Sequence, residues 1–174
     1  MDRFSRDDRS AVMARVGSED SAPELAVRRE LHRRGLRYSL HRKDLPGKPD
    51  VVFRNAQTVL FIHGCFWHLH SCKRGRLPKS NRRFWRKKLE ANRERDARQI
   101  RLLRGAGWKV IVIWTCRVST KLGLTRACDR VEAVVRQRRR LPVANGHSIS
   151  ATAMTNASSD YRGPNHCGAE ERSC

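Results

Sequence analysis

Apolar residues recur along the chain with the spacings of helices and strands. The sequence Ser21-Ala-Pro-Glu24 predicts the start of a helix with a capping box. In it the Ser21 hydroxyl accepts a hydrogen bond from a main-chain N–H of the first turn, and the Glu24 side chain reaches back to the main chain at the start of the helix. Gly35 suits the left-handed end of that helix. The alternating residues 36–40 then predict a strand, and the Pro- and Gly-rich residues 43–49 break regular structure.

The middle of the chain predicts a hairpin, a long helix and a buried strand. Residues 51–53 and 58–62 are β-branched and aromatic, and the polar residues 54–57 between them suit a turn. Residues 80–105 carry an apolar stripe on one helical face. Residues 108–114 are an apolar run, expected to be a strand covered on both sides. With a final helix, the order predicts an α/β fold in which helices flank a central mixed sheet.

The length of 174 residues suits one domain with a tail. From residue 143 the composition changes to Asn, Ser, Ala, Thr and Gly, so we expect a domain over residues 1–142 and a disordered tail over residues 143–174. No apolar run approaches the roughly 20 residues of a membrane span, and the amino terminus lacks a signal-peptide apolar region. We therefore expect an intracellular protein without a membrane partner.

The charge of the chain narrows the choice of partner. Lys and Arg number 38 against 17 Asp and Glu, a net charge of +21, and the tail contributes none of this excess. A nucleic acid is the leading partner for such a charge. A solvated basic surface or an anionic membrane is the alternative, and basicity alone does not separate the three. The motifs along the chain are needed to choose among these three interpretations.

Two thiols and two imidazoles lie within one short segment after the hairpin, and a third thiol ends the strand of residues 108–114. Zinc prefers such ligands in tetrahedral geometry, and four protein ligands make a structural site. His68 is an alternative fourth ligand that spacing does not exclude, and Cys128 in the last helix is expected to be a packed thiol. We assign to zinc the ligands Cys65, His70, Cys72 and Cys116.

A candidate catalytic group surrounds the same hairpin. If the turn is centred between Asn55 and Ala56, Asp50 lies across from the backbone of Phe61 and Ile62. A carboxylate and a carbonyl are oxygen ligands that magnesium accepts. The imidazoles of His63 and His68 follow directly and can carry protons near neutral pH. A Pro-Asp pair that only caps a loop is the alternative.

Two further acids have two interpretations each. Asp96 continues the apolar stripe of the long helix, so its carboxylate needs a partner, and a histidine is a natural one. Pairing with one of the Arg residues around it on a solvated face is the alternative. Glu24 is the capping acid, yet it lies one turn before the apolar Val27 and Leu31, which also allows a position near the site.

Several motifs occur in order and give the chain a resemblance to the very short patch repair (Vsr) endonucleases, over roughly residues 9–141. The long central motif is the most specific of them. They are Leu45-Pro-Gly-Lys-Pro-Asp50, Phe61-Ile-His-Gly-Cys-Phe-Trp-His-Leu-His-Ser-Cys72, Arg83-Phe-Trp85, Glu94-Arg-Asp96 and Gly107-Trp-Lys-Val-Ile-Val-Ile-Trp-Thr-Cys116.

The resemblance implies a role for each matching residue. Asp50 matches the Mg²⁺-binding carboxylate, with the main-chain oxygen of Ile62 as a second ligand. His68 matches the histidine that activates water, His63 lies beside it, and Asp96 supports the site. Glu24 matches an acid near the metal-bound waters, which is the weakest of these assignments. The four zinc ligands match as well. Aromatics that wedge into DNA beside the mismatch are matched by Phe66, Trp67 and Trp85, although Trp85 on the helical stripe also suits core packing.

The resemblance also implies a fold and a reaction. The fold is that of the type II restriction enzymes, although the acidic-x-Lys pair usual there is absent. Two other departures from the family are Ile62, a Thr in some members, and Leu69, often a His. The reaction is Mg²⁺-dependent hydrolysis of one phosphodiester 5′ to the T of a T:G mismatch that arises when 5-methylcytosine deaminates.

The expected setting follows from the same resemblance. We expect a monomer in the bacterial cytoplasm that acts on double-stranded DNA, with mismatch-repair proteins as further partners. Two other functions remain open at this point. One is a zinc-stabilised DNA-binding module that does not cut, and the other is a restriction-type nuclease that acts on paired sites.

Overall fold

The computed structural model describes residues 20–40 and 42–140. The expected tail over residues 143–174 lies outside the described residues. The elements follow the predicted order of helix, hairpin, helix, strand and helix. They are α2 (Ala22–Arg33), β1 (Val51–Phe53), η1 (Arg54–Ala56), β2 (Thr58–His63), η2 (Lys73–Gly75), α3 (Arg82–Gly105), β3 (Lys109–Trp114), η3 (Thr115–Arg117) and α4 (Lys121–Arg140).

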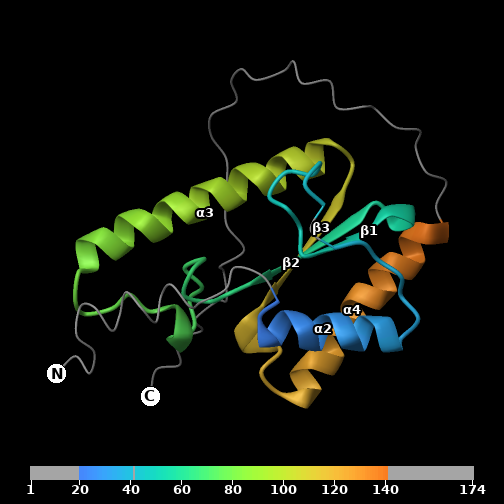
Figure 1. The fold of residues 1–174 in the computed structure, drawn as a ribbon, viewed down its shortest axis with the longest axis horizontal. Helices are drawn as coiled ribbons and strands as arrows, with labels where there is room; N and C mark the ends of the chain where they lie inside the picture. The colour runs from blue at the N-terminus through green and yellow to red at the C-terminus, as the bar shows by residue number, and fades with distance from the viewer. Residues whose placement is uncertain (1–19, 41, 141–174) are drawn as a thin grey trace, which may run out of the picture.

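The three strands form one mixed sheet in the order β1-β2-β3 (Figure 1). β1 and β2 are antiparallel, with Val51 opposite Leu60, as the hairpin predicted. β2 and β3 are parallel, with His63 opposite Trp114. Since parallel neighbours need a crossover, α3 returns the chain to the start of β3. The segments that follow His63 and Trp114 therefore begin at the same edge of the sheet.

Helices cover both faces of this sheet, as expected for the apolar third strand. On one face, Ile100 and Leu103 of α3 pack with Val59 and Val110. On the other face, α2 and α4 enclose a second apolar cluster that includes Val27, Leu31, Leu60, Ile111, Ile113, Val131 and Val135. Cys128 is fully buried in this second cluster, as predicted for a packed thiol. Among the described helices, none is both long and apolar enough to cross a membrane.

The predicted strand over residues 36–40 was wrong in extent. The structure forms a single antiparallel bridge between Ser39 and Val52 instead. The alternation has a different cause, because Tyr38 packs edge-on against Phe53 and its hydroxyl donates to the carbonyl of Arg28. Side-chain packing onto α2 and β1 therefore replaces a ladder of main-chain bonds.

The predicted capping box of α2 was also wrong in detail. Ser21 is the N-cap, but its hydroxyl donates to Oε1 of Glu24 at 2.7 Å instead of accepting a main-chain amide. Glu24 does reach back, and its Oε2 accepts the main-chain N–H of Asp20 at 3.0 Å, one residue before the cap. The helix starts and ends where predicted, with Gly35 at a φ of 77°.

Candidate active site and metal centre

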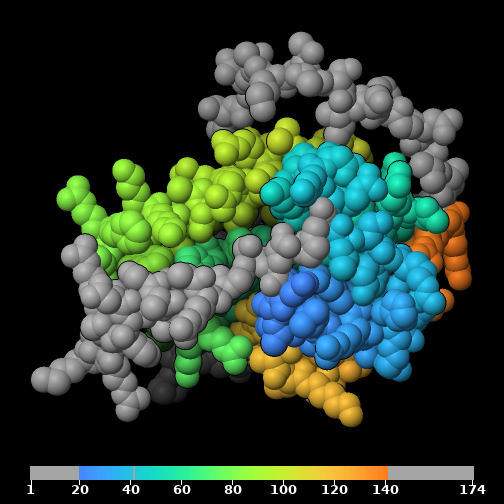
Figure 2. Space-filling model, in the orientation of Figure 1, coloured from blue at the N-terminus to red at the C-terminus, as the bar shows by residue number. Residues whose placement is uncertain are grey.

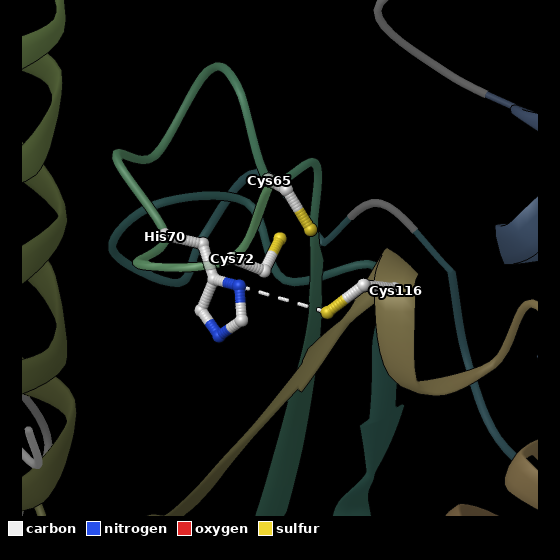
Figure 3. Close-up of side chains that lie close together, drawn as sticks. All are labelled: Cys65, His70, Cys72 and Cys116. Carbon is white, nitrogen blue, oxygen red and sulfur yellow. Dashed lines mark hydrogen bonds between the residues drawn. The ribbon is translucent and has the colours of Figure 1, made fainter. Parts of the chain in front are cut away.

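The thiol cluster consists of Cys65, His70, Cys72 and Cys116, the four residues assigned from the sequence. One ligand atom of each lies within 4.8 Å of all the others. Figure 3 shows three of the side chains on one loop after β2, with Cys116 arriving from η3 after β3. The Nδ1 atom of His70 lies 3.6 Å from the Sγ atom of Cys116. The parallel pairing of β2 and β3 thus brings residues that are far apart in sequence to one point.

Main-chain hydrogen bonds fix the loop that carries this cluster. The N–H of His70 donates to the carbonyl of Cys65 at 3.0 Å, and the N–H of Gly75 donates to that of Cys72 at 2.9 Å. A Cβ on Gly75 would lie 1.8 Å from the carbonyl oxygen of His70, so only glycine fits there. Main-chain contacts thus fold the loop back on itself around the thiol cluster.

The thiols differ in how readily they ionise. A hydrogen bond with His70 lowers the pKa of Cys72 to about 6. Burial, followed by the neighbouring Cys65, raises the pKa of Cys116 to about 12. Metal ligation requires thiolates, so a cation at this point must offset the mutual repulsion of the sulfurs.

The histidine cluster consists of His63, His68 and Asp96, whose ligand atoms also lie within 4.8 Å of one another. Nδ1 of His68 is in hydrogen-bond contact with Oδ2 of Asp96 on α3. The rings of His63 and His68 stack with centroids 3.8 Å apart and planes 5° from parallel. The prediction that Asp96 meets a histidine is therefore confirmed, and His68 joins this cluster instead of the thiol cluster.

His63 forms the inner wall of the histidine cluster. Its side chain is buried, and burial followed by the proximity of His68 lowers its pKa to about 3. The ring is therefore neutral near pH 7, and it stacks on His68 without carrying a charge of its own. His68 keeps the contact with Asp96, and its other ring nitrogen remains able to accept a proton.

Asp50 reaches the same edge of the sheet from β1. Its Oδ2 atom accepts the main-chain N–H of Ile62 at 2.6 Å, which confirms the expected cross-strand position. Ile62 directly precedes His63, so the carboxylate lies one residue along β2 from the histidine cluster. A carboxylate, a strand backbone and two imidazoles thus share one edge.

Trp114 connects the two clusters and was not singled out from the sequence as a site residue. Its ring stacks on His70 with centroids 4.3 Å apart and meets His63 edge-on at 5.4 Å. It is the last residue of β3 and pairs with His63 in the sheet. From the sequence, this position could have been inferred only by predicting the register of β2 and β3 correctly.

The three aromatics expected to wedge into DNA lie together. Phe66 lies 5.1 Å from Trp67 and 5.2 Å from Trp85, measured between ring centroids. Trp85 is 8% exposed, so part of its role is to pack beneath the other two. Phe84, which the sequence pattern did not indicate as a site residue, is 55% exposed and meets Trp85 edge-on at 5.3 Å. The Nζ atom of Lys88 lies over three of these rings, at 5.5 to 5.9 Å from their centroids.

Glu24 is buried at the start of α2, where its carboxylate contacts Ser21, the main chain of Asp20 and Nη2 of Arg28 at 3.4 Å. These contacts support its capping role. Glu24 is not one of the acids and histidines that cluster at the edge of the sheet in the described residues. The structure thus brings His63, His68 and Asp96 into one cluster, places Asp50 against the main chain of the neighbouring Ile62, and leaves Glu24 on α2.

Comparison with known proteins fits this geometry. The family model described as DNA mismatch endonuclease Vsr matches residues 1–74. The type II nicking enzyme V.XorIIP of Xanthomonas oryzae pv. oryzae is 52% identical over 118 residues, which cover 68% of this chain and 87% of that protein. The type II nicking enzyme V.NmeAIP of Neisseria meningitidis is 45% identical over 120 residues, with 69% and 86% covered. The DNA mismatch endonuclease Vsr of Escherichia coli is 37% identical over 117 residues, with 67% and 75% covered.

An α/β domain with a histidine–carboxylate pair beside a strand-borne aspartate is suited to hydrolysis of a phosphodiester. The chain belongs to the Vsr family of DNA mismatch endonucleases. It is a DNA endonuclease, and the alternative of a DNA-binding module that does not cut is set aside.

Proposed function

We propose that the protein nicks one strand of duplex DNA 5′ to the T of a T:G mismatch, by Mg²⁺-dependent hydrolysis. Such mismatches arise when 5-methylcytosine deaminates, and the nick starts very short patch repair. The observation that carries the proposal is the contact of His68 with Asp96, because His68 stacks on His63 and Asp50 contacts the main chain of Ile62, the residue before His63. The relatives named as nicking enzymes and as a mismatch endonuclease support the choice of substrate.

The thiol cluster is the proposed structural zinc site. Zn–S bonds of about 2.3 Å and Zn–N bonds of about 2.05 Å at tetrahedral angles separate a sulfur from a nitrogen by about 3.6 Å. The separation between His70 and Cys116 is 3.6 Å, so the donor set and its spacing fit the ion. Zinc held there would tie the loop after β2 to the end of β3 and so fix the position of His68 between them.

Asp50 and the main-chain oxygen of Ile62 are the proposed Mg²⁺ ligands. The N–H and C=O of one strand residue point toward the same neighbouring strand. Because the N–H of Ile62 meets Asp50, its carbonyl is expected on that side too. The oxygen donors suit Mg²⁺, which when bound would orient a phosphate and stabilise the leaving oxygen.

His68 is the proposed general base. The carboxylate of Asp96 accepts a hydrogen bond from the N–H of Nδ1 and so fixes the tautomer, which leaves the lone pair of Nε2 to take a proton from water. His63 stacks against the ring and holds its plane. Glu24 remains a proposed acid near the metal-bound waters by resemblance alone, since its contacts lie within the first turns of α2.

The proposed wedge is formed by Phe66 and Trp67, with Trp85 as support. Both rings are half-buried and lie on the loop after β2, directly before the proposed base His68. Apolar side chains at a base step trade stacking for a bent duplex, and a mismatch is cheaper to open than a paired step. The restriction-enzyme type of fold, action as a monomer and contact with mismatch-repair proteins complete the proposal.

The test is a nicking assay on two duplexes that differ only in one T:G or C:G pair. We expect Mg²⁺-dependent nicking of the mismatched duplex and little of its parent. The Asp50→Ala variant should lose nicking by about 10²-fold or more while it keeps its zinc. Equal cutting of both duplexes would refute mismatch specificity and favour a restriction-type nuclease. Full activity of the variant would refute the assigned Mg²⁺ ligand.

A further inference from the structure

The end of the sheet opposite the two clusters carries a group of positively charged side chains. β2 begins there and runs toward His63, so about 17 Å of strand separates the two ends. In Figure 1 the last turn of α4, orange-red, lies beside the turn between β1 and β2, away from the green loop that follows β2. We define the distal basic surface by the exposed side chains of Arg54, Arg104, Lys109, Arg139 and Arg140.

Arg138 explains why these residues share one end of the molecule. Its Nε donates to the carbonyl of Ala56 in η1 at 2.8 Å, and its Nη2 donates to the carbonyl of Gly107, before β3, at 3.2 Å. The side chain thereby fastens the last turn of α4 to two turns at the sheet edge. The main-chain N–H of Lys109 also donates to Gln57 at 2.8 Å. The distal basic surface is therefore built on a fixed frame.

Acidic side chains do not neutralise this surface. Among residues 20–40 and 42–140, no carboxylate lies within ion-pair distance of the five side chains that define it. Asp44 has its pKa lowered chiefly by a hydrogen bond from Arg42, and Arg54 is the smallest of the causes. On α4, Glu132 contacts Arg34 and Arg136 instead. Five unneutralised cations at one end repel one another unless a polyanion binds them.

We propose that the distal basic surface binds the phosphate backbone of duplex DNA outside the stretch that the catalytic edge engages. Within the described part of the chain these cations have no carboxylate partner, which suits sequence-independent phosphate contact. Figure 2 shows the orange-red end of α4 exposed at the margin of the molecule, with the green start of α3 at the opposite margin. The enzyme would thus hold a long DNA at two places and nick it at one. This inference uses DNA as the substrate but does not depend on mismatch specificity or on the catalytic roles proposed above.

The test compares the full chain on two duplexes with one central T:G mismatch, of about 9 and about 40 base pairs. At about 3.4 Å per pair the shorter duplex extends only about 14 Å on either side of the mismatch, less than the roughly 17 Å of strand between the two ends, so only the longer duplex spans both. Binding is measured against salt concentration without Mg²⁺. The variant is Arg54→Ala/Arg139→Ala/Arg140→Ala. It leaves Arg138 in place and should unfold at the temperature of the parent.

The matched control removes three exposed cations elsewhere, by Arg29→Ala/Lys121→Ala/Arg126→Ala. A second variant, Arg54→Lys/Arg139→Lys/Arg140→Lys, keeps the charge. An added long duplex without a mismatch distinguishes contact with the bound DNA from contact with a second DNA molecule. At a moderate excess of this competitor, a contact within one complex should still add to the salt slope because of its high effective concentration, whereas a contact with a separate DNA molecule should be replaced.

Each phosphate contact contributes about 0.9 to the slope of log affinity against log salt, so the triple Ala variant should lose about 2.7 on the long duplex. It should lose nothing on the short duplex and nick it at the parent rate. The Lys variant should keep the slope, and the control should change both lengths alike. Equal slopes for parent and triple Ala variant on the long duplex would overturn the proposal and leave the surface to another partner, such as an acidic protein. Absence of T:G nicking by the parent would instead count against the proposed function alone.

Discussion

The thiol cluster and the histidine cluster take residues from the same short segment, but the partners of each residue separate them. His70 faces the sulfur of Cys116, whereas His68, two positions earlier, faces the carboxylate of Asp96. Soft ligands around one point leave no position for a substrate. An imidazole held by a carboxylate keeps one nitrogen for a proton. Two histidines of one motif thus have different partners, and we propose different functions for them on that ground.

The backbone between the two histidines makes this division possible. Leu69 adopts a left-handed conformation with a φ of 49°, which is uncommon for a residue with a branched side chain. The turn there directs His68 toward α3 and His70 toward η3. We therefore expect substitutions in the thiol cluster to have effects of a different kind from substitutions in the histidine cluster.

The largest effect is expected when the thiol cluster loses a ligand. Cys116→Ala should bind no zinc, and its nicking should fall to background because the loop that carries His68 is no longer fixed. Zinc per chain and nicking of a T:G duplex measure the two losses. The matched change is Cys128→Ala, which removes a fully buried thiol from the core and should keep both zinc and nicking. Retention of zinc by the Cys116 variant would contradict the assigned ligand set.

A smaller effect is expected when only the orientation of the base changes. Asp96→Asn should lower the rate of nicking by about 10- to 100-fold, because an amide supports the required tautomer of His68 less well than a carboxylate. Zinc content and thermal unfolding should stay at the parent values. Glu94→Gln changes an exposed acid on the same helix and should leave the rate unchanged. Equal nicking rates for both variants would contradict the role of Asp96 in orienting His68.

The smallest effect comes from a change that touches neither cluster. Hydrogen bonds from Arg33 and Arg34 lower the pKa of Glu30 on α2 from 4.5 to about 2. A depressed carboxyl pKa stabilises the fold above the unfolded value, and this contribution is lost as pH falls from about 4.5 to about 2. Glu30→Gln should therefore unfold a few degrees below the parent at pH 7, consistent with about 1 kcal/mol or less for such pairs. The two unfolding temperatures should converge near pH 2, and a gap that persists there would refute the ion-pair explanation.

Sequence periodicity was enough for the elements whose side chains pack on one continuous core. The hairpin and α3 appeared where predicted because their apolar faces meet across the sheet. The predicted strand over residues 36–40 became one bridge, since β1 has only three residues to pair with it. The capping box differed because the hydroxyl of Ser21 found a carboxylate as its partner.

The candidate site was predictable where residue chemistry limits the choice of partner. Three thiols and an imidazole have few shared uses other than metal binding, so the thiol cluster followed from residue types. The position of Asp50 followed from the symmetry of a hairpin. Phe84 was missed because it lies outside the stripe of α3, and Trp114 because its contact with His70 depends on the register of two parallel strands.

The zinc content of the His68→Ala variant tests the division between the two clusters most directly. We expect one zinc per chain, as in the parent, together with a loss of nicking by about 10²- to 10⁴-fold. His70→Ala, the same change two residues away, should lose the zinc. A His68→Ala protein that contains no zinc, or one that still nicks at the parent rate, would contradict the division between the thiol cluster and the histidine cluster.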